Sequence, residues 1–232
     1  MKQLTATGIM LTRTDFGEAD RILTLLTPEY GKLRLLAKGV RRVKSKLAGG
    51  IELFSVSELV YIRGRGEIGT LVSARLRTHY ANIVRDLDRT MLGYELIKFL
   101  HKHTEDEAEP AYVDLLKQTF EALDNLAVPL PLIQFWFNTQ MLALGGHTPN
   151  LATDTAGARL QAGQTYNFNQ DAVSFTPATS AHGRCTAAHI KLLRLAFAGT
   201  QPILLAQVQG IDTLIGTLAP LTAAMVQTHL LR

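Results

Sequence analysis

The strongest chemical signal in the sequence is a run of basic side chains between residues 32 and 46. Lysine and arginine bind phosphate through charge and hydrogen bonds, and surfaces without such a role normally intersperse both signs of charge. The run therefore predicts binding of a polyanion, above all nucleic acid, whereas a solvated loop that only aids solubility is the alternative. The stretch holds seven basic residues and no acidic one: Lys32, Arg34, Lys38, Arg41, Arg42, Lys44 and Lys46.

Residues 32–35 alternate between basic side chains and leucines. On a strand, both charges would project from one face while the leucines enter a core. Tyr30 and Tyr61 are candidates for stacking on nucleobases, because aromatic rings and cations together bind single strands. Further arginines widen the candidate nucleic-acid site: Arg63 and Arg65, with Arg75 and Arg77 beyond them.

Other motifs fit catalytic chemistry less well. Residues 64–69 match G-x-G-x-x-G, and Asp88 follows about 20 residues later, as in a dinucleotide fingerprint. That fingerprint must open a helix, whereas residues 70–76 have a strand pattern. Cys185 has no evident histidine and carboxylate context for nucleophilic catalysis. The sequence predicts no enzyme and no catalytic residue, and a nucleotide-dependent enzyme is the alternative from another class.

The charge is unevenly distributed along the 232 residues. Residues 1–80 carry 14 Lys/Arg against 7 Asp/Glu, and the remainder carries 10 against 13, for a net charge of +4. With 47% hydrophobic and 19% charged residues, a disordered chain is excluded. The single cysteine excludes a disulfide scaffold, and the N-terminus lacks the long apolar run of a signal peptide. We therefore expect a cytoplasmic protein.

Short apolar runs separated by turn residues predict five strands in the first 80 residues. A long connection separates the third from the fourth, a spacing that fits the five-stranded Greek-key barrel of the OB-fold. Residues 1–80 are therefore expected to form an OB-fold domain that binds nucleic acid. The predicted strands cover residues 6–13, 21–27, 31–38, 51–63 and 68–77.

After residue 80 the apolar period becomes helical, which predicts a mainly α-helical second domain over residues 81–232 and an α+β class for the chain. An irregular insert at about residues 147–185 contains a predicted hairpin. Two uncharged stretches are long enough to span a membrane, but their prolines and polar residues favour buried helices, so no membrane partner is expected. The predicted helices lie near residues 83–103, 111–125, 131–144, 187–198 and 211–231, and the uncharged stretches are 126–144 and 213–231.

Three segments of the first domain form a specific pattern: GEADRILTLLTPEYGK at residues 17–32, AKGVRR at 37–42 and LAGGIELF at 47–54. This pattern closely resembles the RecO family of bacterial DNA repair proteins, and the match is dense over residues 8–77. The resemblance implies an N-terminal OB-fold with a helical domain behind it. It also implies binding to single- and double-stranded DNA and annealing of complementary strands, without enzymatic activity.

The same resemblance implies partners and a location on the nucleoid. The partners are RecR, the acidic C-terminal tail of single-stranded-DNA-binding protein and, indirectly, RecA during its loading. An acidic, hydrophobic tail needs an apolar floor and a basic rim, for which Lys117, Lys191 and Arg194 are the candidate rim residues. An RNA-binding OB-fold protein is the alternative with similar chemistry.

The sequence departs from the family at its zinc site. Many members carry two Cys-x-x-Cys pairs after the third helix. Here Thr153 and Ala156 stand at the positions of the first pair, and His182 and Cys185 form the second. Structural zinc needs four ligands, which threonine and alanine do not supply. We therefore expect no metal and no other cofactor, and a degenerate zinc-finger-like insert held by packing and turn hydrogen bonds.

Overall fold

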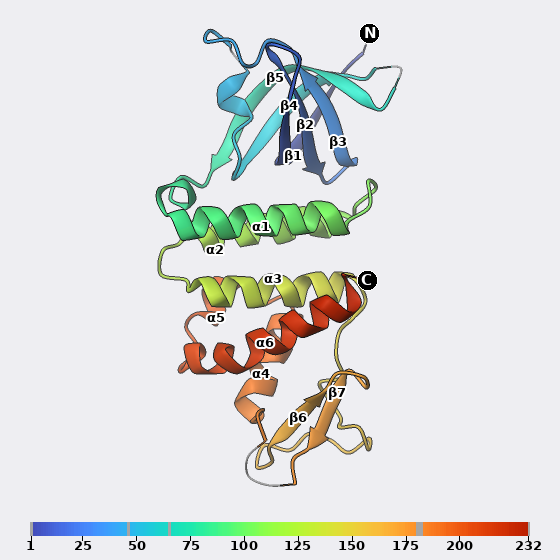
Figure 1. Ribbon diagram of the computed structural model, residues 1–232, viewed down its shortest axis with the longest axis vertical. Coiled ribbons are helices and arrows are strands. Elements are labelled where there is room, and N and C mark those ends of the chain that lie inside the picture. The colour runs from blue at the N-terminus through green and yellow to red at the C-terminus, as the bar shows by residue number, and fades with distance from the viewer. Residues whose placement is uncertain (1, 46, 65, 180–182, 232) are drawn as a thin grey trace. The chain divides into compact units, whose positions relative to one another are not determined.

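The computed structural model describes residues 2–45, 47–64, 66–179 and 183–231 (Figure 1). The chain divides into two compact units, Met1–Asp124 and Asn125–Arg232. The sequence predicted a boundary at residue 80, at the end of the strand pattern. The two differ because the first two helices after residue 80 pack with the barrel.

Five strands form a closed barrel in the first unit. Neighbouring strands follow the order β1-β2-β3-β5-β4, and only β3 and β5 run parallel. This is the predicted OB-fold, a five-stranded Greek-key barrel. The strands are β1 (Gln3–Phe16), β2 (Asp20–Thr27), β3 (Gly31–Ala37), β4 (Ser55–Ile62) and β5 (Ile68–His79), and a short 3-10 helix, η1 (Ala48–Gly50), lies between β3 and β4.

Two strands differ in length from the sequence prediction. β1 continues beyond residue 13 because its end pairs with β2, where Asp15 lies opposite Arg21. β4 begins at residue 55 instead of 51, since Phe54 adopts a φ of 53°, which breaks the extended backbone. The segment before β4 is therefore part of a long β3–β4 loop.

Inward- and outward-facing side chains alternate along the strands, and the inward-facing ones fill the barrel. Leu23, Leu25 and Leu35 are buried inside it, and Leu33 packs against the same core. This confirms that the leucines of residues 32–35 face inward. Tyr61 also belongs to this core and is only 2% exposed.

Two helices of the first unit, α1 (Leu87–His103) and α2 (Pro110–Asp124), pack beside the barrel. Both contact β1, and α2 also contacts β2. Ile9, Leu11 and Leu26 are not part of the barrel core cluster, yet they are buried on the two strands that α1 and α2 contact. A short turn, η2 (Ile83–Arg85), joins β5 to α1. The continuous apolar run at the middle of β1 thus has both its faces covered.

Contacts between aromatic rings stabilise the packing of the helices against the barrel. Phe54 meets Tyr94 of α1 and Phe120 of α2 edge to face, with ring centroids 5.3 and 5.5 Å apart. Tyr80 meets Phe120 in the same way, and its N–H donates to the Phe54 carbonyl oxygen at 3.1 Å. Edge-to-face pairs add stabilisation beyond the area they bury. The end of the β3–β4 loop is therefore fixed by the helices.

Burial, together with the carboxylates of Glu121 and Asp124, raises the pKa of Tyr80 from 10.0 to about 12. The folded state disfavours the phenolate, so the stability linked to this proton is complete below pH 10 and is lost as pH rises through about 12. We expect the free energy of unfolding to fall by about 2 kcal/mol across that window. Urea unfolding at several alkaline pH values measures the loss. Tyr80→Phe should abolish most of it, whereas the exposed Tyr94→Phe should leave it in place.

The second unit is built on helix α3, which packs against α4 and α6. The Trp136 indole N–H of α3 donates to the Thr200 carbonyl oxygen at 2.9 Å. In the described part of the chain, no helix has the length and apolar character needed to cross a membrane. The elements of this unit are α3 (Leu130–Leu144), β6 (Tyr166–Asn169), β7 (Ser174–Pro177), α4 (Ala187–Phe197), α5 (Pro202–Leu205) and α6 (Ile211–His229).

The insert between α3 and α4 contains the predicted hairpin, β6 with β7. Asp154 Oδ1 accepts the backbone N–H groups of Ala156 and Ala158, both at 2.9 Å, in the loop where the family's first cysteine pair would stand. Cys185 is buried and exchanges two backbone hydrogen bonds with Tyr166. His182 lies outside the described residues. Among those that are described, no group of three or more His, Cys, Asp or Glu side chains could hold a metal ion.

Candidate nucleic-acid interface

The basic loop, defined as residues 38–45, is held against the turn between β1 and β2. The Gly39 N–H donates to Asp20 Oδ1 at 2.7 Å, and the Arg41 N–H donates to the Ala19 carbonyl oxygen at 2.9 Å. Gly39 has a φ of 65°, which glycine adopts without the penalty of a side chain. The loop therefore has a defined path on the barrel: Val40 is buried in the barrel core, whereas the basic side chains of the loop are exposed.

Besides Arg41, three cations of the basic loop are exposed: Lys38, Arg42 and Lys44. Within the described ranges, none of the three forms an ion pair. Their charge is therefore available to an anionic ligand. Two further predicted DNA-binding residues, Lys46 and Arg65, lie outside the described residues.

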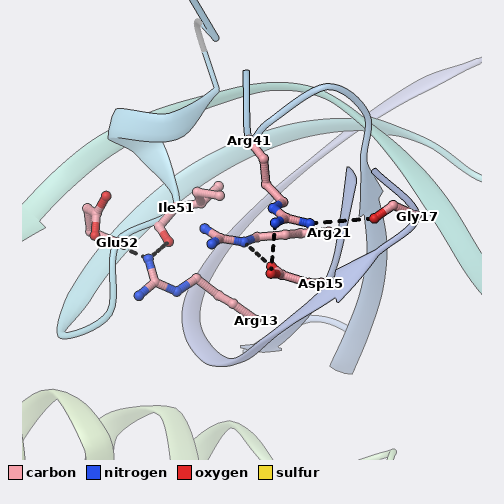
Figure 2. Close-up of polar contacts among 7 residues, drawn as sticks. All are labelled: Arg13, Asp15, Gly17, Arg21, Arg41, Ile51 and Glu52. Carbon is pink, nitrogen blue, oxygen red and sulfur yellow. Dashed lines mark hydrogen bonds and ion pairs between the residues drawn. The ribbon is translucent and has the colours of Figure 1, made fainter. Parts of the chain in front are cut away.

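An arginine cluster adjoins the basic loop and comprises Arg13, Arg21 and Arg41 (Figure 2). Arg21 Nε donates to Asp15 Oδ1 at 2.8 Å, and the Arg41 guanidinium lies 3.5 Å from Asp15 Oδ2. Arg41 also donates to the Gly17 carbonyl oxygen at 3.5 Å. The predicted residue Arg41 thus has a second role, because its side chain ties the basic loop to β1.

Arg13 completes the cluster from β1. Its guanidinium donates to the Ile51 carbonyl oxygen and forms an ion pair with Glu52 at 3.2 Å (Figure 2). Sequence reasoning missed Arg13 and Arg21, because neither lies in the basic run. Arg13 lies two residues before Asp15 on β1. Arg21 lies opposite Asp15 on β2, a relation that only the strand pairing reveals.

The hydrogen bond from Arg21 and the charge of Arg41 hold the pKa of the Asp15 carboxyl below its ordinary value, although partial burial opposes them. Asp15 is therefore an anion throughout the neutral range, and it keeps two guanidinium groups beside each other. Like-charged groups repel, so a carboxylate between them makes their proximity tolerable.

Lys32 does not belong to the free basic surface, contrary to the sequence prediction. Its Nζ donates to the carbonyl oxygens of His101, at 2.8 Å, and Thr104. These carbonyls lie at the C-terminal end of α1, where a cation is favoured by the helix dipole. Burial lowers the pKa of this ammonium group. Lys32 thus joins the barrel to α1.

Arg34 is also engaged by carboxylates, because its guanidinium lies 3.5 Å from Glu67 and 3.6 Å from Asp106. On β5, Arg77 likewise forms an ion pair, with Glu58 of β4, whereas Arg75 is exposed and forms no ion pair within the described residues. Exposed ion pairs contribute little to stability. Arg34 and Arg77 are therefore paired with nearby carboxylates, which the run of basic residues in the sequence did not indicate.

A small cavity of about 130 Å³ opens beside β3. Tyr30, Arg34 and the exposed Arg63 line it, and Tyr30 is 46% exposed. Tyr61 lines the cavity too, but its ring is buried in the barrel, and burial raises the pKa of its hydroxyl. The prediction that Tyr61 stacks on bases is therefore wrong. Tyr30 keeps an exposed ring at this cavity.

The candidate rim residues for a protein tail divide between the two units. Lys117 lies on α2 and pairs with Asp114 at 3.7 Å. Lys191 and Arg194 lie on α4 and line one cavity of about 90 Å³. Arg194 donates two hydrogen bonds to the Leu151 carbonyl oxygen, at 2.9 and 2.6 Å. The structure therefore brings Lys191 and Arg194 together.

The glycine motif lies in the β4–β5 connection, with Gly69 already inside β5. The Gly69 backbone pairs with Leu35 of β3. A dinucleotide fingerprint needs a helix N-terminus at this point to meet the pyrophosphate. A strand follows instead, so the motif does not have the geometry of a nucleotide site.

Known proteins share the sequence pattern of the strands that form the barrel. Residues 1–80 match the family model described as "Recombination protein O N terminal". "DNA repair protein RecO" of Dehalococcoides mccartyi (strain ATCC BAA-2266) is 37% identical over 145 residues, which cover 62% of this chain and 56% of that protein. The chain thus matches little more than half the length of this relative.

Two further relatives extend the match. "DNA repair protein RecO" of Desulfatibacillum aliphaticivorans is 31% identical over 154 residues, covering 65% of this chain and 60% of that protein. The protein of the same name from Exiguobacterium sibiricum is 30% identical over 165 residues, covering 71% and 66%. Since the N-terminal family model, these relatives and the OB-fold barrel all agree, the chain belongs to the RecO family.

Proposed function

We propose that the first unit binds single-stranded DNA through the basic loop and the arginine cluster, and that the protein acts in DNA repair. The observation that carries this proposal is the exposed set Lys38, Arg42 and Lys44, fixed beside Arg21 and Arg41 on an OB-fold. Cations placed on a rigid frame bind phosphates with a strong salt dependence and without base specificity. The names of the relatives, DNA repair proteins, support the same role.

We infer the finer activity from what the resemblance to this family implies. The protein binds double-stranded DNA as well, anneals complementary strands, and helps RecR to load RecA on strands coated by single-stranded-DNA-binding protein. Within the second unit, Lys191 and Arg194 of α4 are the residues proposed to meet the acidic tail of that protein, and Lys117 of α2 is proposed for the same role. The mechanism needs no bond breaking: neutralising phosphates on two strands lowers their repulsion, so that bases can pair. The site of action is the nucleoid in the cytoplasm.

An annealing assay tests this function directly. Labelled complementary oligonucleotides coated with single-stranded-DNA-binding protein should anneal at least about tenfold faster when the protein is added, without any nucleotide, because phosphate neutralisation lowers the repulsion between strands. Binding of labelled oligo-dT should weaken steeply with salt. Binding to RNA alone, or annealing that requires ATP, would contradict the proposal.

A further inference from the structure

The carboxylate of Asp15 lies at the centre of the arginine cluster, although a carboxylate is expected to repel DNA. Its side chain is half exposed, so simple electrostatics predicts that it weakens binding of any phosphate nearby. The contacts of Asp15 suggest another role. Its two oxygens engage different arginines, Oδ1 with Arg21 and Oδ2 with Arg41 (Figure 2).

These contacts leave much of both guanidinium groups open to a ligand. Arg21 engages Asp15 through Nε, and in the described part of the chain its two terminal nitrogens carry no hydrogen bond. Arg41 uses its terminal nitrogens on Asp15 and Gly17 at distances of 3.5 Å, which are long for a hydrogen bond. The side chains of Arg21 and Arg41 are about one third exposed. An arginine fork with free terminal nitrogens can bind a phosphate through two parallel hydrogen bonds.

Asp15 also couples two separate elements. Arg21 comes from β2 and Arg41 from the basic loop, and the loop backbone is held at the same turn by Gly39 and Arg41. Without the carboxylate, two cations facing each other would separate and each would lose a fixed orientation. A side chain that is already ordered loses less entropy when it binds.

We propose that Asp15 is a positioning residue of the DNA site, which holds Arg21 and Arg41 as a paired receptor for one backbone phosphate. This inference rests on the proposed function, that is, on DNA binding by the first unit. It predicts that removing a negative charge weakens DNA binding, the opposite of the effect expected from charge alone.

The test is the affinity of the full chain for fluorescently labelled oligo-dT across a salt series, measured for Asp15→Asn and a matched control. Asp15→Asn should weaken binding about fivefold at low salt and make the salt dependence shallower, because the phosphate loses its bidentate partner. The control, Glu18→Gln, removes an exposed carboxylate in the adjacent turn and should strengthen binding by less than about twofold. A gain in affinity for Asp15→Asn similar to that of the control would overturn the proposal.

Further variants separate positioning from damage to the fold. Arg21→Lys keeps the charge and the pairing with Asp15 but lacks the fork, so it should weaken binding about threefold, because a point charge replaces a planar two-nitrogen donor. In the Arg21→Ala/Arg41→Ala background, Asp15→Asn should cause no further loss. Unchanged affinity for Arg21→Lys would contradict the proposal even if Asp15→Asn did not fold. Absence of DNA binding by the unmodified chain would instead reject the proposed function.

Discussion

Lys38→Glu/Arg42→Glu/Lys44→Glu should lose at least about 100-fold in affinity for single-stranded DNA at about 0.1 M salt, with the fold intact. Each phosphate contact on a single strand contributes about −0.7 to the slope of log K against log salt, so three lost contacts flatten the slope by about 2. These side chains are exposed and form no ion pair within the described ranges, so the free energy of unfolding should change by less than about 1 kcal/mol. Fluorescence anisotropy across a salt series measures both the affinity and the slope.

A matched control uses three exposed cations of the same unit that lie before β1, on η2 and on α1: Lys2→Glu/Arg85→Glu/Lys102→Glu. It makes the same change in net charge, yet these residues are not part of the basic loop or the arginine cluster. Screening limits long-range effects to about 10 Å at this ionic strength, so the control should lose less than about threefold. Equal losses in both variants would show that net charge, and not the basic loop, determines DNA binding.

Gly93→Ala should destabilise the first unit by about 2 to 3 kcal/mol, although alanine is the better helix former by about 1 kcal/mol. A Cβ at Gly93 would lie 2.5 Å from Phe54 Cε1 and 3.0 Å from its Cζ. The Phe54 ring has little room to move, because it is buried between Tyr94 and Phe120 and its backbone has a φ of 53°. Denaturation monitored by amide hydrogen exchange in residues of α1, α2 and the barrel measures the effect.

The same substitution at another helical glycine provides the control. A Cβ at Gly216 of α6 meets no heavy atom within 4 Å. Gly216→Ala should therefore stabilise the second unit by about 0.5 to 1 kcal/mol through helix propensity alone. Stabilisation by Gly93→Ala as well would mean that Phe54 can rearrange, and that α1 does not fix the end of the β3–β4 loop.

The sequence predicted the barrel well because its signals are local. Alternation placed Leu33 and Leu35 in the core, and turn residues separated the five strands near their observed ends. The same alternation carried a signal for Tyr61, which lies two residues after the core residue Leu59 and so faces inward. The prediction that Tyr61 stacks on bases did not take into account that residues two apart on a strand face the same side.

The rest of the site depends on contacts between residues distant in the chain. Lys32 lies 69 residues from His101, so no local pattern reveals that its ammonium ends at the terminus of a helix. Asp15 gathers Arg21 and Arg41 from two elements, and only Arg41 lies in the basic run. Charge counting therefore located the surface but did not distinguish residues available to a ligand from those committed to the fold. That distinction requires the strand register and the packing of α1.

Closure of the barrel gives the first unit a particular way of meeting partners. Each of its five strands has a neighbour on both sides, since β1 pairs with β2 and β4, and β5 joins β3 to β4. Where two strands pair, their backbone groups are already hydrogen-bonded, so a partner could add a strand only outside the paired segments; β3 and β5, for example, pair over residues 34–36 and 68–70 alone. Over the paired segments, recognition of this unit runs through side chains and loops. A substitution of one such side chain can then change the affinity for one partner, while the backbone hydrogen bonds of the barrel are unchanged.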